Sequence, residues 1–543
     1  MHTPTVATTT PSPREPTDHL TRPVARSYDA AEPTAGERDM AHRVGPRRIA
    51  VIAAVTAIAL TATALTAACA PEAPLVELDE PVPGTVVAQP PDTVGPLHLV
   101  GDRMLDANGR TVMLRGMNSV AKSAPYVSID QPGSLGDGEL EYLRNSGFNV
   151  VRLGVAFSAL TPEPGVVDED YLDRVLVTLE RLTDAGLWVQ LDFHQDVFHL
   201  MPEWAAPADA AALSDEAPAL LSFIGWAAAY LSDRSLRQWN SFVAGESIID
   251  GRSVASVLGD AAAALATRVA DDPRVIGIEL LNEPFPGDPV LDCIAQGCPG
   301  RDRQLSDRYA EMAAPIRAVA PDLPLWIEPF APTGYVAQPS LPRPAIDGEG
   351  APAQIGVAWH LYCKDTDGGR PEPVDDATRV FCETRLRNGF DAGDSLSRQV
   401  GGPSVLNEFG ASRNPLDASI ATRLADERFV SWMYWHLGSA TSPTDSTIED
   451  TVEAHIIRPY PQATAGTPGT LRYAPVTGEF SYSFTPDASI DAPTSIVVPA
   501  RAYPRGYELE VDNGTVTSDE RAGLVTVVPD DPSASVTVRL HRR

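Results

Sequence analysis

The sequence has few positive charges and none of the familiar metal-binding patterns. Its 543 residues contain 42 Lys and Arg against 73 Asp and Glu, a formal net charge of −31. Such an excess of acid argues against a polyanionic partner such as nucleic acid. The ten histidines form no HExxH pattern and the cysteines no CxxC pair, so we expect no metal and no cofactor.

The first part of the chain lacks the periodicity of a folded domain. Residues 1–39 are polar and rich in Pro and Thr, so we expect them to be disordered or to lie upstream of the true start. Residues 40–69 begin with a basic stretch and continue as an uncharged apolar run up to Cys69, which is the layout of a secretory signal. Residues 70–96, rich in Pro, Glu, Asp and Val, are typical of a tether.

The end of the signal segment, LTAAC, resembles a bacterial lipoprotein signal, in which the cysteine is lipidated. Cys69 is therefore a lipidation candidate. The alternatives are a plain cleaved signal and an uncleaved anchor, because about 20 apolar residues can span a bilayer. In each case we expect an exported protein, extracellular or attached to the outer face of the cell membrane. The assembly state stays open, with a monomer favoured.

Few cysteines remain once Cys69 is set aside, and their number is even. Cys293, Cys298, Cys363 and Cys382 form a set that suits an exported chain with two disulfides. Proximity favours Cys293–Cys298 and Cys363–Cys382 over the two other pairings, and the remaining alternative is four buried thiols. We expect these bonds to fasten loops that follow strands carrying candidate site residues.

The body of the chain alternates buried-strand patterns with helical ones. Residues 98–118 form two apolar runs around Asn108-Gly109, a hairpin signal. The eight strand candidates are 112–118, 148–155, 187–194, 275–282, 324–330, 355–362, 403–410 and 430–438. Because the strands are apolar on both faces and helical patterns such as 171–186 and 253–272 separate them, we predict an α/β fold, a (β/α)8 TIM barrel over 97–452. Chemistry then belongs at the C-terminal strand ends.

The pattern changes after about His455. Short β-rich runs between Gly, Pro and Asp turns replace the helical period, as in GEFSYSFTP and GLVTVVP. This pattern predicts a C-terminal antiparallel β-sandwich domain over 453–543. The length of the chain agrees with two folded units plus extra segments.

Two of the predicted barrel strands end in an Asn-Glu pair. Asn282-Glu283 closes the fourth strand and Asn407-Glu408 closes the seventh. Two carboxyls at strand ends are the minimum set for cleaving a glycosidic bond. In a retaining mechanism they stand about 5–5.5 Å apart, one as nucleophile and the other as acid/base. The two pairs therefore predict a two-glutamate hydrolase site.

The neighbours of these carboxyls divide their roles. Arg152 ends the second strand, where its guanidinium can pair with Glu408 and hold it ionised. Glu283 has no obvious cationic neighbour in the sequence and should keep its proton, which makes it the acid. Two further acids compete. We interpret Glu279 as a structural group in mid-barrel and Glu328 as a residue of the site wall.

Other polar and aromatic residues fall at the remaining strand ends. His194 and Asp196 follow the third strand and suit the binding of sugar hydroxyls. His360 and Tyr362 alternate along the sixth strand and therefore point the same way. Trp435 ends the eighth strand and offers a stacking platform for a sugar ring. Each has an ordinary structural alternative, such as loop capping for His194 or core packing for Trp435, but their joint order favours a site.

That order resembles a known family. The series Arg152, His194, Asn282-Glu283, His360-x-Tyr362, Glu408 and Trp435 is similar to the retaining barrel glycosidases of glycoside hydrolase family five. More narrowly, AKS (121–123), HQDVF (194–198), LNEPFPG (281–287), WHLYC (359–363) and LNEFG (406–410) resemble endoglycoceramidases and related glycosphingolipid glycosidases. RPYPQATAG (458–466) resembles the opening of the C-terminal sandwich in that family. The resemblance runs from about His98 to the C-terminus.

The resemblance implies roles for individual residues. It assigns Glu283 as acid/base and Glu408 as nucleophile. Asn282 would bond the 2-hydroxyl of the sugar at the cleavage point, and Tyr362 would steady Glu408. The sugar pocket that it implies consists of Lys122, His194, Asp196, Trp239 and Trp435.

An insertion of about 75 residues between the third and fourth strands is long for a barrel loop, and so is a functional candidate. It could form an apolar groove for a lipid beside the sugar pocket, or a helical lid whose apolar face packs internally. Its apolar residues are Leu200, Met201, Trp204, Leu220, Leu221, Phe223, Ile224, Trp226, Tyr230, Trp239 and Phe242.

The leading hypothesis is an exported retaining β-glycosidase that hydrolyses the link between a glycan and a lipid aglycone, by a double displacement with two Glu, as endoglycoceramidases do. Its partner would be a glycolipid or oligosaccharide substrate. One alternative keeps the mechanism and changes the substrate to a polysaccharide, as in an endoglucanase, or to a simple or steryl glycoside. An alternative of another class is a non-catalytic surface glycan-binding protein.

Overall fold

The structure is a computed structural model that describes residues 76, 78–87, 95–127, 135–216, 228–246, 248–331, 337–346, 354–363, 375–437 and 450–543. All of them belong to one compact unit, Ala57–Arg543. The expected disordered start (1–39) and signal segment (40–69), with Cys69, lie outside the described residues, as does part of the expected tether. Among the helices of the described residues, none combines the length and the apolar character needed to cross a membrane.

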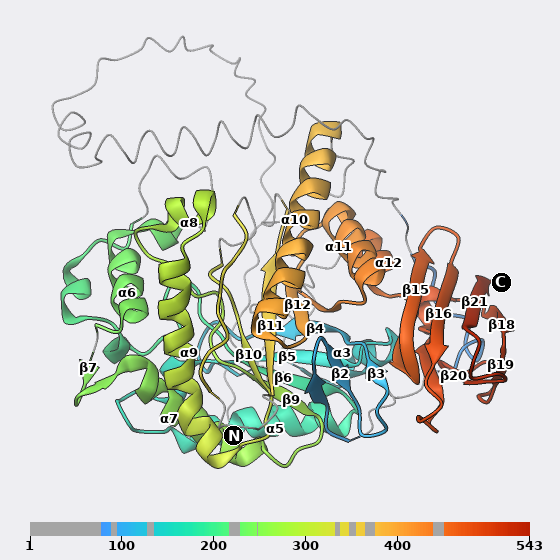
Figure 1. Ribbon diagram of the computed structural model, residues 1–543, viewed down its shortest axis with the longest axis horizontal. Helices are drawn as coiled ribbons and strands as arrows, with labels where there is room; N and C mark the ends of the chain where they lie inside the picture. Colours follow the sequence, from blue (N-terminus) through green and yellow to red (C-terminus); the bar gives the residue numbers. More distant parts are fainter. Residues whose placement is uncertain are drawn as a thin grey trace, which may run out of the picture. The chain divides into compact units, whose positions relative to one another are not determined.

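Eight parallel strands close into a barrel in the order β4-β5-β6-β9-β10-β11-β12-β13 (Figure 1). Their bounds are β4 (Arg115–Ser119), β5 (Val150–Val155), β6 (Trp188–Phe193), β9 (Val275–Glu279), β10 (Leu325–Ile327), β11 (Ile355–Leu361), β12 (Ser404–Phe409) and β13 (Ser431–Tyr434). Each overlaps one of the predicted strands, which confirms the predicted barrel. Nearly every strand residue is buried, because helices cover the outside of the barrel and side chains fill its interior.

Helices connect the strands on the outside of the barrel. The two predicted helical patterns form α5 and α7, which begin after Asp168 and Ser253; each of these side chains accepts a bond from a backbone N–H of the first turn. Helix α10 ends at Gly401, whose φ of 74° is the left-handed conformation that glycine adopts at little cost. The helices are α3 (Asp137–Asn145), α4 (Phe157–Leu160), α5 (Glu169–Asp184), α6 (Asp233–Ala244), α7 (Val254–Val269), α8 (Val290–Gln296), α9 (Pro299–Val319), α10 (Asp376–Val400), α11 (Pro415–Arg428) and α12 (Asp450–Ile456).

The barrel interior is apolar near the starts of the strands and polar near their ends. The apolar layer is one buried cluster that includes Val150, Trp188, Ile276, Trp326, Ala358, Val405 and Met433. Residues further along or just after the same strands are polar, with side chains that are buried; they are Arg152, Asp192, Glu279, Glu328, His360 and Asn407. Strand residues two apart share a face, and in β9 a register shift between Val275 and Gly277 adds one residue to this spacing, so both layers point into the barrel. The polar layer therefore rests on an apolar floor.

A hairpin of short strands packs against that floor. β1 (His98–Val100) pairs with β2 (Arg103–Leu105), which pairs with β3 (Thr111–Val112) across the predicted turn at Asn108-Gly109. Leu99 and Met104 belong to the same buried cluster as the apolar layer. The hairpin therefore closes the N-terminal end of the barrel.

The C-terminal residues form two antiparallel sheets, as predicted. One has the order β15-β16-β21-β18, with β15 (Gly466–Ala474), β16 (Glu479–Pro486), β18 (Tyr507–Asp512) and β21 (Val536–Arg542). The other has the order β1-β2-β3-β14-β17-β20-β19, with β14 (Tyr460–Thr464), β17 (Thr494–Val497), β19 (Gly514–Val516) and β20 (Leu524–Pro529). A shared apolar core includes Tyr482 from the first sheet and Ile496 from the second. The pairing of Val112 with Ala463 means that the second sheet draws strands from both ends of the folded chain.

Buried ion pairs join the barrel to the C-terminal sheets. The Asp426 carboxylate, at the end of α11, lies 3.1 Å from Nη2 of Arg115 in β4 and also contacts Arg458, just before β14. Burial raises the pKa of Asp426, an effect that both guanidinium groups oppose. A second contact links Glu453 in α12 to Arg501, at 2.6 Å.

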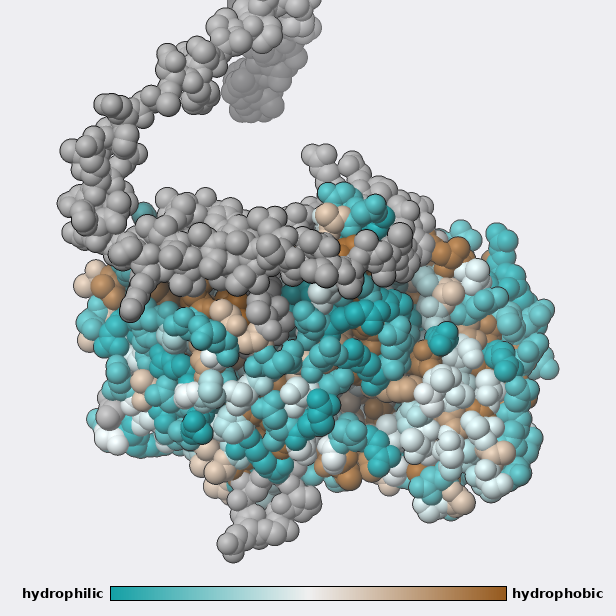
Figure 2. All heavy atoms as spheres, turned by 45° about the horizontal axis from the view of Figure 1, so that its top comes forward, coloured by the Kyte–Doolittle hydropathy of each residue, from teal (hydrophilic) through white to brown (hydrophobic). Residues whose placement is uncertain are grey.

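The described surface is mostly polar. Figure 2 shows hydrophilic residues over most of the face drawn, with apolar residues in small separate patches. The exposed large apolar side chains of the described residues are single valines spread along the chain, among them Val82, Val177 and Val476. The catalytic end of the barrel is therefore the natural place to look for function.

Candidate active site

The two predicted carboxyls meet at the C-terminal end of the barrel. Glu408 lies in β12, and Glu283 follows β9 in the loop toward α8. One oxygen of each lies within 4.8 Å of the other. Both side chains are largely buried, with 5% of Glu408 and 13% of Glu283 exposed. The fold therefore brings together two acids that lie far apart in the sequence.

Glu408 is surrounded by donors. Nη1 of Arg152 lies 2.6 Å from Oε1 of Glu408, which is the expected pair. The Tyr362 hydroxyl donates to Oε2 at 2.7 Å. Arg152 and Tyr362 thus fix the position of both oxygens of the Glu408 carboxyl group.

Arg152 is the centre of the polar layer. Its Nε donates to Glu279 at 2.8 Å, and its Nη2 donates to Oδ1 of Asn282 at 2.7 Å and lies 3.0 Å from Asp192. Burial alone would lower the pKa of Arg152, but the charges of Asp192, Glu279 and Glu408 raise it well above its usual range. The guanidinium therefore stays charged, and Glu279 has the structural place expected for it.

Glu283 does have a cationic neighbour, contrary to the sequence-based expectation. Nδ1 of His360 lies 2.8 Å from Oε1 of Glu283 and 3.3 Å from Oε2 of Glu408. Burial lowers the pKa of His360, but the charges of Glu328 and Glu408 raise it well above its usual value. The imidazole comes from β11, the strand next to β12, so sequence proximity to Glu283 could not reveal it.

A second cluster lies beside the carboxyls. Nζ of Lys122 is 2.6 Å from Asp196 and 4.4 Å from the centre of the Trp435 ring. The His194 ring stacks on Trp435 at 5.4 Å between ring centres. Asp192 joins this cluster to the carboxyl site, because its Oδ2 lies 2.8 Å from Nδ1 of His194 while its Oδ1 contacts Arg152.

The charges in the second cluster support one another. Burial lowers the pKa of His194, but Asp192 raises it to about 9 overall. Burial would raise the pKa of Asp196, but the bond from His194 and the charge of Lys122 bring it well below its usual range. An ammonium, a carboxylate and an aromatic face within one small space can bind the hydroxyls and the ring of a sugar.

Comparison with known families decides the class of protein. A family model described as cellulase (glycosyl hydrolase family 5) matches residues 105–441, more than half of the chain. The chain belongs to glycoside hydrolase family 5. A model of the family 5 C-terminal domain also matches residues 458–540, which cover most of the two C-terminal sheets. The protein is therefore a glycosidase.

Its similarity extends to named relatives. This family 5 enzyme is 34% identical over 461 residues to endoglycoceramidase I of Rhodococcus hoagii (strain 103S), which covers 83% of this chain and 89% of the relative. A solved structure of endo-glycoceramidase II from Rhodococcus sp. has a TM-score of 0.65 and 25% identity, with 81% of this chain and 99% of that chain covered. Its complex with ganglioside GM3 gives 0.66 and 24%, with 82% and 100% covered. The resemblance drawn from the motifs is confirmed.

One expected sugar-pocket residue lies elsewhere in the glycosidase. Trp239 is in α6 and has no exposed surface. Its ring packs edge-on against Phe198, at 5.2 Å, and Phe242, at 5.9 Å. A ring enclosed in this way has no face for a sugar, so the expectation for Trp239 does not hold in this structure.

The insertion between β6 and β9 is described only in part. Leu200, Met201, Tyr230, Trp239 and Phe242 are buried, and all but Leu200 belong to the main core cluster, which agrees with the helical-lid alternative for these residues. The other apolar candidates from Leu220 to Trp226 lie outside the described residues. The Tyr230 hydroxyl is 3.5 Å from Oε2 of Glu283 and thus belongs to the site.

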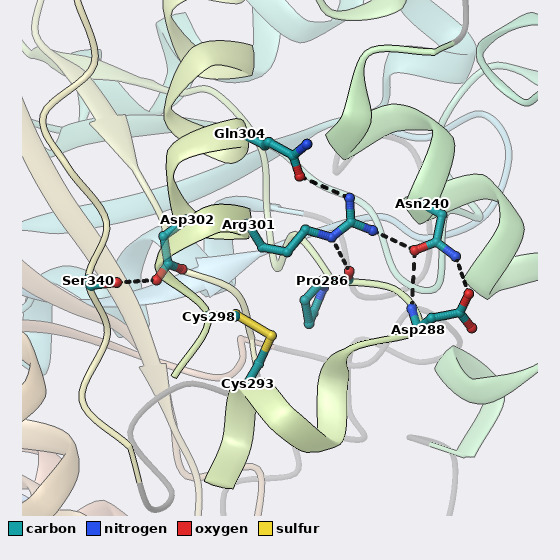
Figure 3. Close-up of a disulfide and its surroundings, with 9 residues drawn as sticks. All are labelled: Asn240, Pro286, Asp288, Cys293, Cys298, Arg301, Asp302, Gln304 and Ser340. Carbon is teal, nitrogen blue, oxygen red and sulfur yellow. Dashed lines mark hydrogen bonds between the residues drawn. A yellow bond between two sulfur atoms is a disulfide. The ribbon is translucent and has the colours of Figure 1, made fainter. Parts of the chain in front are cut away.

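Both favoured disulfides are present and lie close to the site. Cys363 follows Tyr362 directly and is bonded to Cys382 in α10. Cys293 in α8 is bonded to Cys298, which precedes α9 (Figure 3). Figure 3 also shows Arg301 reaching the backbone oxygen of Pro286, at 3.1 Å, from the first turn of α9. These bonds fasten the segments that follow β9 and β11.

Two site residues, Asp192 and Asn118, were not singled out from the sequence. They orient charged partners, because Asn118 accepts from Arg152 at 3.0 Å and Asp192 contacts His194. Asn407, already noted as part of an Asn-Glu pair, donates to Glu279 at 2.6 Å. Asp192 lies two residues before His194 in the same predicted strand, and the alternation of the strand was the signal that could have found it.

Two groups of the described residues have ligand atoms spaced closely enough for a metal, Glu279 with Glu328 and His360, and Glu283 with His360 and Glu408. His360 belongs to both. Its Nδ1 hydrogen-bonds to Glu283 at 2.8 Å and its Nε2 lies 3.0 Å from Glu328, so both nitrogens face carboxylate oxygens, whereas zinc would need a free lone pair at about 2.0–2.1 Å from the ion. The donor set fits a proton-sharing network better than a metal centre.

Proposed function

We propose that this family 5 enzyme is a retaining β-glycosidase that hydrolyses the bond between a glycan and a lipid aglycone. The substrate class rests on the similarity to endoglycoceramidase I over most of both chains. The observation that carries the mechanism is the approach of the Glu283 and Glu408 oxygens to within 4.8 Å. Retaining enzymes place their carboxyls about 5–5.5 Å apart, whereas inverting enzymes need about 6.5–9.5 Å for an intervening water.

The first step assigns one task to each carboxyl. Glu408, oriented by Arg152 and Tyr362, attacks the anomeric carbon as the bond to the aglycone oxygen breaks. Glu283 gives its proton to that oxygen, so the aglycone leaves as an alcohol and the sugar stays as an ester of Glu408. Glu283, now a carboxylate, then takes a proton from water, whose oxygen attacks the anomeric carbon and frees Glu408.

The second cluster would hold the glycan during both steps. Asn282 is oriented by Arg152 and by its own bond to the backbone oxygen of Gln195, at 2.8 Å, which suits a contact to the sugar 2-hydroxyl. Lys122 and Asp196 would bind other hydroxyls, and the Trp435 ring would support a sugar face. Apart from Trp239, which is enclosed in the core, the residues named by the family resemblance have contacts that are compatible with their roles.

Product analysis tests the substrate class. The full chain is incubated with a mixed panel of glycosphingolipids, a steryl glucoside and soluble cello-oligosaccharides, and the products are identified by mass spectrometry. We expect intact oligosaccharide and ceramide from the glycosphingolipids. Stepwise loss of single sugars, or turnover of the steryl glucoside or cello-oligosaccharides alone, would contradict the proposal.

The mechanism has its own test. Glu408→Gln should lower turnover on the order of 10⁴-fold, because the nucleophile is lost, while oligosaccharide binding measured by calorimetry persists. Nuclear magnetic resonance of the first product should show the β-anomer. An α-anomer would exclude the retaining mechanism, and a wild type without hydrolysis of any glycoside would favour the glycan-binding alternative.

A further inference from the structure

Glu328 is a buried acid that touches both the backbone and the side-chain partner of Glu283. It follows β10 and is 2% exposed. Its Oε2 accepts the backbone N–H of Glu283, and its Oε1 lies 3.0 Å from Nε2 of His360. No step of the double displacement uses this carboxyl, yet it makes two contacts that converge on the acid/base.

The contact through His360 reaches both catalytic carboxyls. While Nε2 of His360 faces Glu328, Nδ1 faces Oε1 of Glu283 at 2.8 Å and Oε2 of Glu408 at 3.3 Å. When Nδ1 carries a hydrogen, it donates to Oε1 of Glu283, so the acidic proton of Glu283 belongs on Oε2. That is the oxygen near Tyr230 rather than the one near the imidazole.

The contact through the backbone acts on the conformation of Glu283. Its φ is 41°, in the left-handed region that is sterically unfavourable for a residue with a side chain. This conformation directs the Glu283 N–H into the barrel, where Glu328 accepts it. Glu328 is itself held at its backbone by Tyr309, whose hydroxyl donates to the Glu328 carbonyl at 2.8 Å and accepts its N–H at 3.2 Å.

The electrostatic surroundings agree with this geometry. Burial raises the pKa of Glu328 to about 8, although the positive charge of His360 opposes the shift. Among the described residues, titratable groups that act on Glu328 or His360 come from β9 and its loop, α9, β12 and the insertion; they are Glu279, Glu283, Tyr309, Glu408 and Tyr230. In this group of acids and phenols, His360 is the base through which Glu328 reaches Glu283.

We propose that Glu328 is a positioning residue for acid catalysis, which acts through His360 and the Glu283 amide to keep the proton of Glu283 on the oxygen that faces the leaving group. The inference rests on the proposed function, because it takes Glu283 as the acid/base. It predicts that losing Glu328 harms only the step that needs this proton.

Leaving groups of different basicity separate this role from a structural one. The leaving group of an octyl β-lactoside is a strongly basic alkoxide, so its departure needs acid assistance. The dinitrophenolate of a dinitrophenyl β-lactoside departs without such assistance. For Glu328→Gln we expect kcat/KM to fall on the order of 100-fold for the octyl substrate and by less than about 3-fold for the dinitrophenyl substrate. The pH profile should also shift, because Glu328 acts on the charge of His360, which contacts both catalytic carboxyls.

A matched control is Asp302→Asn. Asp302 is also a buried acid, 4% exposed, but it bonds Ser340 beside the Cys293–Cys298 bond and not His360 (Figure 3). This variant should leave both rates within about 2-fold of wild type. Should E328Q not fold, Glu328→Asp keeps the carboxyl group and withdraws it by one methylene, and the same split is expected at smaller size.

The outcomes are distinguishable. Equal losses on both substrates in E328Q, or an unshifted pH profile, would overturn the role of Glu328. Glu283→Gln serves as the reference, because it must show the leaving-group split if Glu283 is the acid. If E283Q itself shows equal losses, the proposed function fails; if only E328Q does, the further inference fails.

Discussion

Asp417 is an ionisable residue that water scarcely reaches. It lies in α11, is 4% exposed, and its Oδ2 accepts the N–H of Cys363 at 2.7 Å. Burial raises its pKa to about 7, although the N–H groups of Cys363 and Gly410 oppose the shift. A raised carboxyl pKa in the folded state makes stability depend on pH near neutrality.

The direction of this pH dependence follows from the pKa of Asp417 in the unfolded and in the folded chain. In the unfolded chain an Asp titrates near pH 4, so between about pH 4 and 7 the folded protein keeps a proton that the unfolded chain has lost. The stabilisation of the folded protein by this retained proton is complete at low pH and is lost as the pH rises, at up to about 1.4 kcal/mol per pH unit.

Asp417→Asn keeps an acceptor oxygen but cannot titrate. Its free energy of unfolding in urea should therefore fall less steeply with pH than that of wild type. Parallel curves would contradict the prediction, and the exposed Asp391→Asn should follow wild type.

For single residues, the sequence predicts a place in the site well when the position in a strand and the chemistry of the side chain agree. Arg152 lies in β5, Glu408 lies in β12 and Glu283 closely follows β9, so each is a polar group in or beside a buried apolar strand, which marks it. The role of Glu328 could not be predicted, because its partner His360 lies on the neighbouring strand and only folding brings the two together. The expectation that Trp239 lines the sugar pocket was wrong because it rested on a short local sequence match, which does not indicate the direction in which a ring packs.

The two disulfides act on elements rather than on single residues. The bond between Cys363 and Cys382 ties the end of β11 to α10, next to Tyr362. The bond between Cys293 and Cys298 closes a much shorter loop between α8 and α9. Their sequence separations are 19 and 5, so their effects on the unfolded chain should differ.

Replacing each pair by serine separates these effects. On a chain-entropy basis, we expect a loss of about 3 kcal/mol for Cys363→Ser with Cys382→Ser and about 2 kcal/mol for Cys293→Ser with Cys298→Ser. Because Tyr362 donates to Glu408, only the first double variant should also lower kcat severalfold at a temperature where both are folded. Urea denaturation and steady-state kinetics measure the two quantities. A larger kcat loss in the second double variant would refute the link to Tyr362.

The helices and strands were the part of the structure that the sequence predicted best. Apolar runs bounded by polar ends gave all eight barrel strands, because a parallel strand covered on both faces has a continuous apolar sequence. Strand partners were less accessible. Nothing local to Val112 indicates that it pairs with Ala463 rather than with a barrel strand.

At the scale of the whole molecule, a buried group of charges connects the barrel to the C-terminal sandwich. Asp426 is the carboxylate shared by Arg115 and Arg458, and all three side chains are at most 4% exposed. Removing a carboxylate from such a group leaves two buried cations without their counter-ion. The stability of the two domains should therefore be coupled through this residue.

Asp426→Asn tests that coupling. We expect it to lower the free energy of unfolding by about 3 kcal/mol, while kcat stays near wild type because the site lies at the other end of the barrel strands. Asp512→Asn is the control, since it breaks an exposed pair with Arg539 and should cost less than about 1 kcal/mol. Both values come from urea denaturation followed by fluorescence. A loss in D426N no larger than in D512N would show that the contact contributes little.

The sheet that contains both β3 and β14 has a consequence for the order in which the protein can be completed during synthesis. The Thr111 hydroxyl bonds the backbone oxygen of Gly466, 355 residues later. A ribosome delivers the hairpin early, and its edge must remain unpaired until almost the entire barrel has emerged. Contacts of such long sequence range form slowly because loop closure must precede them. The first strands of this enzyme are thus made first and paired last.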